Sequence, residues 1–155
     1  MWRDYLELTK PRLSALVLVT TALAYGLGRR VPEPMSGVIL VLIGTALVVG
    51  GANALNQWSE RDFDALMERT KQRPLPAGRL SPDAACRFGW ALSVGGIVWL
   101  SLAVNMLSGL LAAISWAVYV LLYTPLKRRT PLCTLVGAGP GALPPLIGWA
   151  GARGA

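Results

Sequence analysis

The sequence contains no histidine and only two cysteines, Cys86 and Cys133, among its 155 residues. The cysteines are far apart and neither belongs to a C-x-x-C pair, so the pattern argues against a zinc site. Charge is also scarce, because 15% of the residues are charged, against about 25% in an ordinary soluble domain. Acidic residues are the rarest charged type, with 8 Asp plus Glu beside 15 Lys plus Arg, and the net charge is +7.

Apolar residues are abundant instead, at 54% of the chain, and they fall in long blocks rather than in amphipathic stripes. The block 88–123 would extend about 54 Å as one helix, whereas a bilayer core is about 30 Å thick. We therefore expect it to fold back near Asn105 and Ser108-Gly109. The sequence predicts an all-α polytopic bundle of about five transmembrane helices in a single membrane domain, residues 1–155. Its apolar blocks are 13–28, 36–55, 88–123 (two helices) and 132–151.

Five alternating spans divide the basic residues unequally between the two sides of a membrane. One side carries 12 of them: Arg3, Lys10, Arg12, Arg61, Arg69, Lys71, Arg73, Arg79, Arg87, Lys127, Arg128 and Arg129. The other side carries Arg29, Arg30 and Arg153. The positive-inside rule then predicts a multi-pass cell-membrane protein whose N-terminus and acidic/basic loop, about 56–87, are cytoplasmic. Because the lipid bilayer explains the basic excess, no nucleic-acid partner is expected.

Local signals mark several helix boundaries. Ser81-Pro82-Asp83 combines an N-cap, a proline at the first helical position and an acid in the first turn, so a helix should begin near residue 82. RPLPAG at 73–78 should not be helical, because its prolines and glycine interrupt a helix. The block 132–151 is rich in glycine and proline, so its helix should be kinked and closely packed.

Half of the acidic residues are crowded just after the second block, at Glu60, Asp62, Asp64 and Glu68. If the second helix continues through residue 68, Asn56, Glu60 and Asp64 share one face at i, i+4 and i+8. Gln57 and Glu68 would then lie near the edge of that face, and Asp62 opposite it.

Carboxylates this close resist ionising together unless a cation lies between them, and oxygen-only ligands favour Mg²⁺ or Mn²⁺ over Zn²⁺. The basic residues that follow, Arg69, Lys71 and Arg73, could neutralise a diphosphate bridged by that metal. The pattern therefore suggests ionisation of a prenyl diphosphate at a membrane surface. A solvated face with local salt bridges is the alternative interpretation.

Three ordered segments carry a resemblance to a known family. The first, NALNQWSERDFDALMERTKQRPLPAGRLSP at 53–82, resembles the first signature of the UbiA-type intramembrane prenyltransferases, with Asn56, Glu60 and Asp64 at the acidic-motif positions. YLELTKPRLSALVL at 5–18 is similar to the family's start of the first helix. YTPLKRRTPLCTLVGAGPGALPPLIGWAG at 123–151 looks like its next signature, and its ending favours the branch of protoheme IX farnesyltransferases, which make heme O.

The resemblance implies an activity and a set of roles. It implies transfer of a farnesyl group from farnesyl diphosphate to a vinyl group of protoheme IX, with Mg²⁺ held by Asn56, Glu60 and Asp64, which are also the candidate catalytic residues. The implied candidates for binding the substrate diphosphate are Arg12, Arg69, Lys71, Arg73, Tyr123 and Lys127. An aromatic quinone precursor as the acceptor stays open as an alternative.

The resemblance covers only the first half of a fold of about nine helices, and the family's second acidic motif is absent from these 155 residues. We therefore expect a fragment, or a chain that works with a separate second half or as a homo-oligomer. A non-catalytic assembly partner is a further alternative. By itself the chain is expected to be inactive or very weak.

Overall fold

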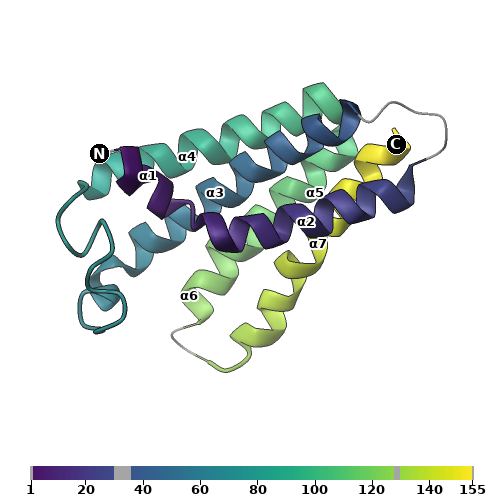
Figure 1. Cartoon of the computed structure of the whole chain (residues 1–155). Coiled ribbons are helices and arrows are strands. Elements are labelled where there is room, and N and C mark those ends of the chain that lie inside the picture. Colours follow the sequence, from purple (N-terminus) through teal and green to yellow (C-terminus); the bar gives the residue numbers. More distant parts are fainter. Residues whose placement is uncertain (1, 30–35, 128–129, 155) are drawn as a thin grey trace.

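The computed structural model describes residues 2–29, 36–127 and 130–154, and within these ranges the protein is helical with no strand. The chain begins with a short helix, α1 (Trp2–Leu8), that the sequence did not predict. Long helices then lie side by side, as Figure 1 shows. The elements after α1 are α2 (Pro11–Gly28), α3 (Ser36–Asp64), α4 (Pro82–Trp99), η1 (Leu100–Val104), α5 (Met106–Ala117), η2 (Val118–Tyr123), α6 (Thr124–Leu126) and α7 (Cys133–Arg153).

Four of the helical segments are long and apolar enough to cross a membrane: Pro11–Gly28, Ser36–Asp64, Pro82–Val104 and Met106–Leu126. They coincide with the first four predicted helices. The fifth block also forms a helix, α7, but its glycines and prolines keep it outside this set. Large apolar side chains project outward, with Leu27 86% and Leu102 80% exposed, as expected for surfaces that meet lipid. The protein is a multi-pass membrane protein.

Two predicted boundaries are confirmed and one is wrong. The 88–123 block turns at Asn105, whose side-chain oxygen accepts a hydrogen bond from the Ser108 backbone N–H at 2.7 Å, although Ser108-Gly109 lies inside α5. Ser81 caps α4 by accepting from the Ala84 N–H at 3.2 Å. The second helix does not reach residue 68 but ends at Asp64. The chain turns there, and the Thr70 hydroxyl donates a hydrogen bond to the Asp64 carbonyl at 2.9 Å.

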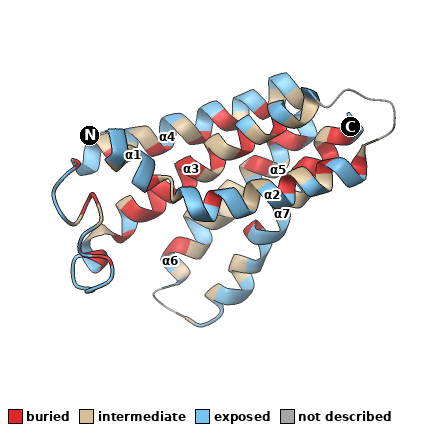
Figure 2. Cartoon of the chain, viewed as in Figure 1, coloured by how far each residue is buried: buried red, intermediate tan, exposed pale blue. Residues whose placement is uncertain are grey.

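Small residues allow the helices to approach closely, which is a common way to pack helices in a membrane. α3 packs along α4, and a Cβ added at Gly51 would lie 2.6 Å from the Gly89 carbonyl oxygen and would also collide with the Ser93 hydroxyl. α2 packs along α7, where a Cβ at Gly148 would overlap the Thr21 carbonyl. Figure 2 shows that buried residues follow these contacts, while the outer faces are exposed.

Helix α7 continues through Pro140, Pro144 and Pro145. A proline has no N–H, so Pro144 leaves the carbonyl of Pro140 without its usual helical donor. The Ser115 hydroxyl, from α5, donates to that carbonyl at 3.4 Å. A neighbouring helix thus supplies the hydrogen bond that the proline removes, as backbone groups within a bilayer require.

The segment 65–81 joins α3 to α4 by a series of turns, and RPLPAG is non-helical as predicted. Its Leu75 and Leu80 belong to a small apolar cluster with Leu8, Ala54 and Ala85, from α1, α3 and α4. The cluster fixes this loop and α1 against the end of α3. These contacts hold the loop and α1 beside the polar end of α3.

Candidate functional site

The last three turns of α3 bury a series of polar side chains. Their exposed fractions are 3% for Asn53, 2% for Asn56, 2% for Gln57, 7% for Glu60 and 5% for Asp64. Buried polar groups are costly unless they are hydrogen-bonded, so their partners decide what this region is. Within the described residues, every one of the five bonds to a group outside α3.

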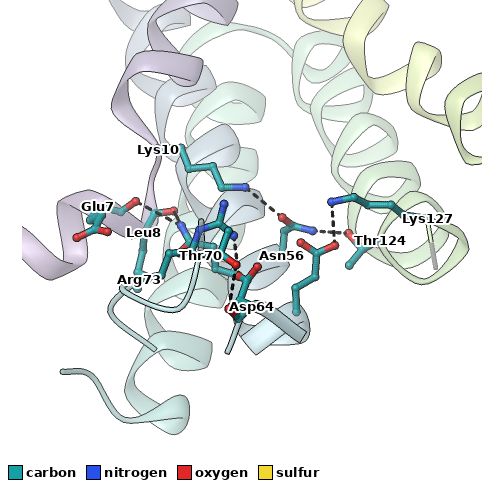
Figure 3. A network of polar contacts seen from close by, with 11 residues as sticks. Glu7, Leu8, Lys10, Asn56, Asp64, Thr70, Arg73, Thr124 and Lys127 are labelled. Carbon is teal, nitrogen blue, oxygen red and sulfur yellow. Dashed lines mark hydrogen bonds and ion pairs between the residues drawn. The ribbon is translucent and has the colours of Figure 1, made fainter. Parts of the chain in front are cut away.

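Asn56 lies at the centre of the cluster, with partners on both sides (Figure 3). Its side-chain oxygen accepts from the Lys10 ammonium at 3.1 Å, and its amide nitrogen donates to the Thr124 hydroxyl at 3.2 Å. Thr124 is 2% exposed and donates to the carbonyl of Tyr119 at 2.9 Å. Asn56 therefore joins the α1–α2 turn to the end of the fourth span.

The two carboxylates on the same face each meet a basic side chain from another element. Glu60 lies 3.2 Å from the Lys127 ammonium, which follows α6. Asp64 lies 2.6 Å from an Arg73 guanidinium nitrogen in the 65–81 loop. The predicted trio of Asn56, Glu60 and Asp64 is thus found together, with opposite charges balancing the two acids.

The structure adds one residue to this cluster that the sequence did not single out, Lys10, which was counted only among the basic residues near the membrane. It has φ 49°, and among the described residues it is the only non-glycine with a positive φ. It precedes α2 as the N-cap without a side-chain cap bond, since an ammonium has no acceptor for a backbone N–H, and it donates to Asn56. Burial, and then the nearby Arg73 charge, lowers the pKa of Lys10 to about 8. The signal in the sequence that could have drawn attention to Lys10 was its place directly before Pro11 and an apolar helix.

The other predicted diphosphate ligands lie elsewhere. Arg12 and Arg69 are exposed, and Lys71 pairs at 2.7 Å with Glu68, whose side chain is 90% exposed. In the described part of the chain no hydrogen bond or ion pair joins these three basic residues to the acidic face. Glu68 does not border that face, since α3 ends before it.

Two residues near the acidic face behave differently from one another. Asp62 is 77% exposed at its side chain and pairs with Arg61, on the side predicted for it. Gln57 is buried, and its amide nitrogen donates to the carbonyls of Glu7 and Leu8.

Arg30, Arg128 and Arg129 lie outside the described residues.

Tyr123 stacks on Tyr119, with ring centroids 5.4 Å apart, and both line a cavity of about 630 Å³. The cavity lies between α2, α3, α5, η2 and α7, and its wall is mostly apolar. It adjoins the polar cluster, since Asn53 and Tyr123 belong to its lining and are close in the chain to Asn56 and Thr124. The remaining lining residues are Leu13, Val17, Val48, Val49, Ala52, Ser115, Trp116, Thr134, Gly137, Ala138, Pro140, Gly141 and Pro144. An apolar molecule could lie here with a polar end at the cluster.

The oxygen atoms of Asn56, Glu60 and Asp64 form a donor set suited to a hard cation. Across the described ranges no group of three or more His, Cys, Asp or Glu residues could hold a metal by itself. Two carboxylates and one amide fit Mg²⁺, which takes few protein ligands and fills its shell with phosphate oxygens and water.

Comparison with known proteins agrees with the sequence motifs. Residues 17–155 match the UbiA prenyltransferase family. The chain is 47% identical to a protoheme IX farnesyltransferase of Solibacter usitatus (strain Ellin6076), over 98% of this chain and 55% of that protein. It is 49% identical to one of Anaeromyxobacter sp. (strain Fw109-5), over 98% and 51%.

A third relative, a protoheme IX farnesyltransferase of Sorangium cellulosum (strain So ce56), is 56% identical over 81% of this chain and 45% of that protein. The chain thus spans about half the length of the curated relatives it matches. No solved structure matches it. The predicted family is confirmed: the chain belongs to the UbiA prenyltransferase family.

Proposed function

We propose that this chain supplies one half of a site that transfers a farnesyl group from farnesyl diphosphate to a vinyl group of protoheme IX, giving heme O. The observation that carries the proposal is the buried face of Asn56, Glu60 and Asp64, each bonded to a different neighbouring element beside an apolar cavity. The names of its relatives, which are protoheme IX farnesyltransferases, support the choice of acceptor.

The acidic face would hold Mg²⁺ through the side-chain oxygens of Asn56, Glu60 and Asp64. Bound there, the cation would supply positive charge to the diphosphate. Lys10, Arg73 and Lys127 already lie at this face, and their charges would neutralise the departing pyrophosphate as its C–O bond breaks. Tyr123, at the wall of the cavity, would border the same end of the substrate. Arg12, Arg69 and Lys71 stay candidates for a less direct role.

The cavity would hold the farnesyl chain and exclude water from the reacting carbon until the vinyl group attacks. That attack would form the new C–C bond and leave a cation at the former vinyl group, which water would capture with loss of a proton to give the hydroxyethylfarnesyl group. We further propose that the N-terminus and the loop of about 56–87 face the cytoplasm, on the basis of their excess of Lys and Arg. Since relatives are about twice as long, a second half-protein or a second copy is proposed to complete the site.

The test uses membranes from cells that lack heme O synthesis and express this chain. They receive farnesyl diphosphate, heme and Mg²⁺, and heme O is read by mass. In membranes where heme O forms, Glu60→Gln and Asp64→Asn should each lower product by about 100-fold or more, because each would remove a charge that holds the metal. Asp62→Asn is the matched control, since that acid is exposed and two residues from each of the others, and it should leave product unchanged.

The same variants are tested for binding, which does not require turnover. Calorimetry of the purified chain in detergent should show Mg²⁺-dependent binding of pyrophosphate that Glu60→Gln and Asp64→Asn remove and Asp62→Asn keeps. Equal binding by all three variants would contradict the proposal. A prenylated aromatic quinone precursor in place of heme O would change the acceptor, and binding without any product would favour half an enzyme or an assembly partner.

A further inference from the structure

The turn between α1 and α2 is bonded to α3 through its backbone. The amide nitrogen of Gln57 donates to the carbonyls of Glu7 at 3.3 Å and Leu8 at 3.1 Å. The amide nitrogen of Asn53 donates to the carbonyl of Thr9 at 3.2 Å. Three successive carbonyls of the turn therefore accept from two amides that are one helical turn apart on α3.

Further contacts hold the same turn. The Ser14 hydroxyl donates to the Thr9 carbonyl at 2.7 Å and accepts from Asn53 at 3.4 Å. Leu8 is fully buried. A Cβ built at Gly50 would lie 3.3 Å from the methyl of Thr9, so α3 also approaches the turn closely at that point. The turn is thus fixed by polar and steric contacts to one face of α3.

Lys10 is the next residue, and its backbone conformation is one that L-residues rarely adopt. Such a conformation persists only where surrounding contacts impose it, and it is often found at functional sites. Here the Lys10 ammonium, which follows this turn, donates to the side-chain oxygen of Asn56 (Figure 3). The charged neighbours of the ammonium are Glu60 and Asp64 of α3, Arg73 of the loop and Lys127 after α6.

We propose that Asn53 and Gln57 are positioning residues, which hold the α1–α2 turn so that the Lys10 ammonium reaches the diphosphate of the substrate. The inference rests on the proposed function, because it needs a diphosphate at the acidic face. The polar residues of α3 would then have two roles. Asn56, Glu60 and Asp64 would contact the ligands, whereas Asn53 and Gln57 would hold the α1–α2 turn, with Lys10, beside them.

A purely structural role would be to satisfy the last carbonyls of α1, which have no partner within their own helix. Removing the amides would then lower stability and leave ligand contacts unchanged. The two roles are distinguished by which lysines a bound diphosphate protects. The chain has three lysines, at positions 10, 71 and 127, so each can be followed separately.

The experiment is amine labelling of the 155-residue chain in detergent, read by mass spectrometry with and without Mg²⁺ and pyrophosphate. In the unaltered chain, pyrophosphate should lower labelling of Lys10 and Lys127 by about fivefold or more. Lys71, on an exposed loop, serves as the internal reference. The test variants are Gln57→Met, Gln57→Glu and Asn53→Leu, and circular dichroism selects those that remain helical.

The matched control is Ser93→Ala. Ser93 is 1% exposed and makes two hydrogen bonds, to the Gly89 carbonyl and from the Trp116 ring nitrogen, but it does not touch the turn. In this variant pyrophosphate should protect Lys10 and Lys127 as it does in the unaltered chain. In the test variants Lys10 should lose its protection while Lys127 keeps it. Where the chain is assayed together with the half that completes the site, the apparent KM for the prenyl diphosphate should rise more than kcat falls.

Folded variants that still protect Lys10 fully would overturn the inference. An unaltered chain in which only Lys127 is protected would overturn it too, while leaving the proposed function intact. If pyrophosphate protects neither lysine, the proposed function fails and the inference fails with it.

Discussion

The two halves of α3 are buried by different kinds of contact, although they form one continuous helix. From Ser36 to Gly51 the helix buries glycines and apolar side chains such as Val41 and Val48 against α4, η1 and α7. From Ala52 to Asp64 it buries amides and carboxylates, each bonded to a group from elsewhere in the chain. The packing of the first half depends on the close fit of apolar surfaces, and that of the second depends on hydrogen bonds and ion pairs to other parts of the chain.

This difference separates stability from chemistry along the helix. Close contacts in the first half join small or apolar groups, so a change there should alter packing and little else. Polar groups in the second half need partners from α1, the 65–81 loop and α6 at once, because a buried amide or carboxylate without a partner is costly. Substitutions chosen along and around α3 test this separation.

The largest stability effect is expected in the packed half. Gly51→Ala places a methyl group where the backbone of α4 lies 2.6 Å away, so it should lower the free energy of unfolding by about 2 kcal/mol or more. Gly95→Ala, on α4 with open space around it, should change stability by less than about 1 kcal/mol. Thermal unfolding in detergent measures both, and equal effects at the two glycines would contradict the close contact.

A smaller effect, of opposite sign, is expected next to the polar half. Lys10→Gly removes both the ammonium and the strained left-handed residue, whereas Lys10→Met removes the ammonium alone. The glycine variant should therefore be about 1 kcal/mol more stable than the methionine variant. Both should bind pyrophosphate about tenfold more weakly, as measured by calorimetry. Unchanged binding in either variant would remove Lys10 from the site.

The smallest effect is expected on the exposed loop. Lys71→Met breaks an ion pair with Glu68 in which both side chains are largely exposed, so stability should change by less than about 0.5 kcal/mol. Pyrophosphate affinity should change no more than about twofold. A tenfold loss in the same titration would instead restore Lys71 as a ligand of the diphosphate.

Much of the fold could be predicted because it depends on local signals. Long apolar blocks, the Ser81-Pro82 start of α4 and the polar turn at Asn105 act through neighbouring residues, and each appears where expected. The end of α3 at Asp64 was missed because it depends on Thr70 folding back, and the preceding sequence contains no helix-breaking residue. Helix α1 was missed because it is seven residues long and gains its stability from packing.

The site divides in the same way. The i, i+4 and i+8 spacing of Asn56, Glu60 and Asp64 is a property of one helix, so it could be predicted from sequence. Lys10 could not be assigned, because its place depends on a turn held by contacts with α3. Arg69 and Lys71 were expected near the acids because they follow them in the sequence, and Arg12 because of the family resemblance.

The hydrogen bonds of Asn56 also constrain the order in which the protein can be made. Its partner Lys10 lies 46 residues earlier in the chain and Thr124 lies 68 residues later, and Glu60 pairs with Lys127 across 67 residues. A ribosome that delivers the spans one after another must therefore release the fourth before the contacts with Thr124 and Lys127 can form, whereas the contact with Lys10 can form earlier. Until then Asn56 lacks Thr124 and Glu60 lacks Lys127, whereas Asp64 can already pair with Arg73, so the polar end of α3 gains its native contacts in two stages during synthesis.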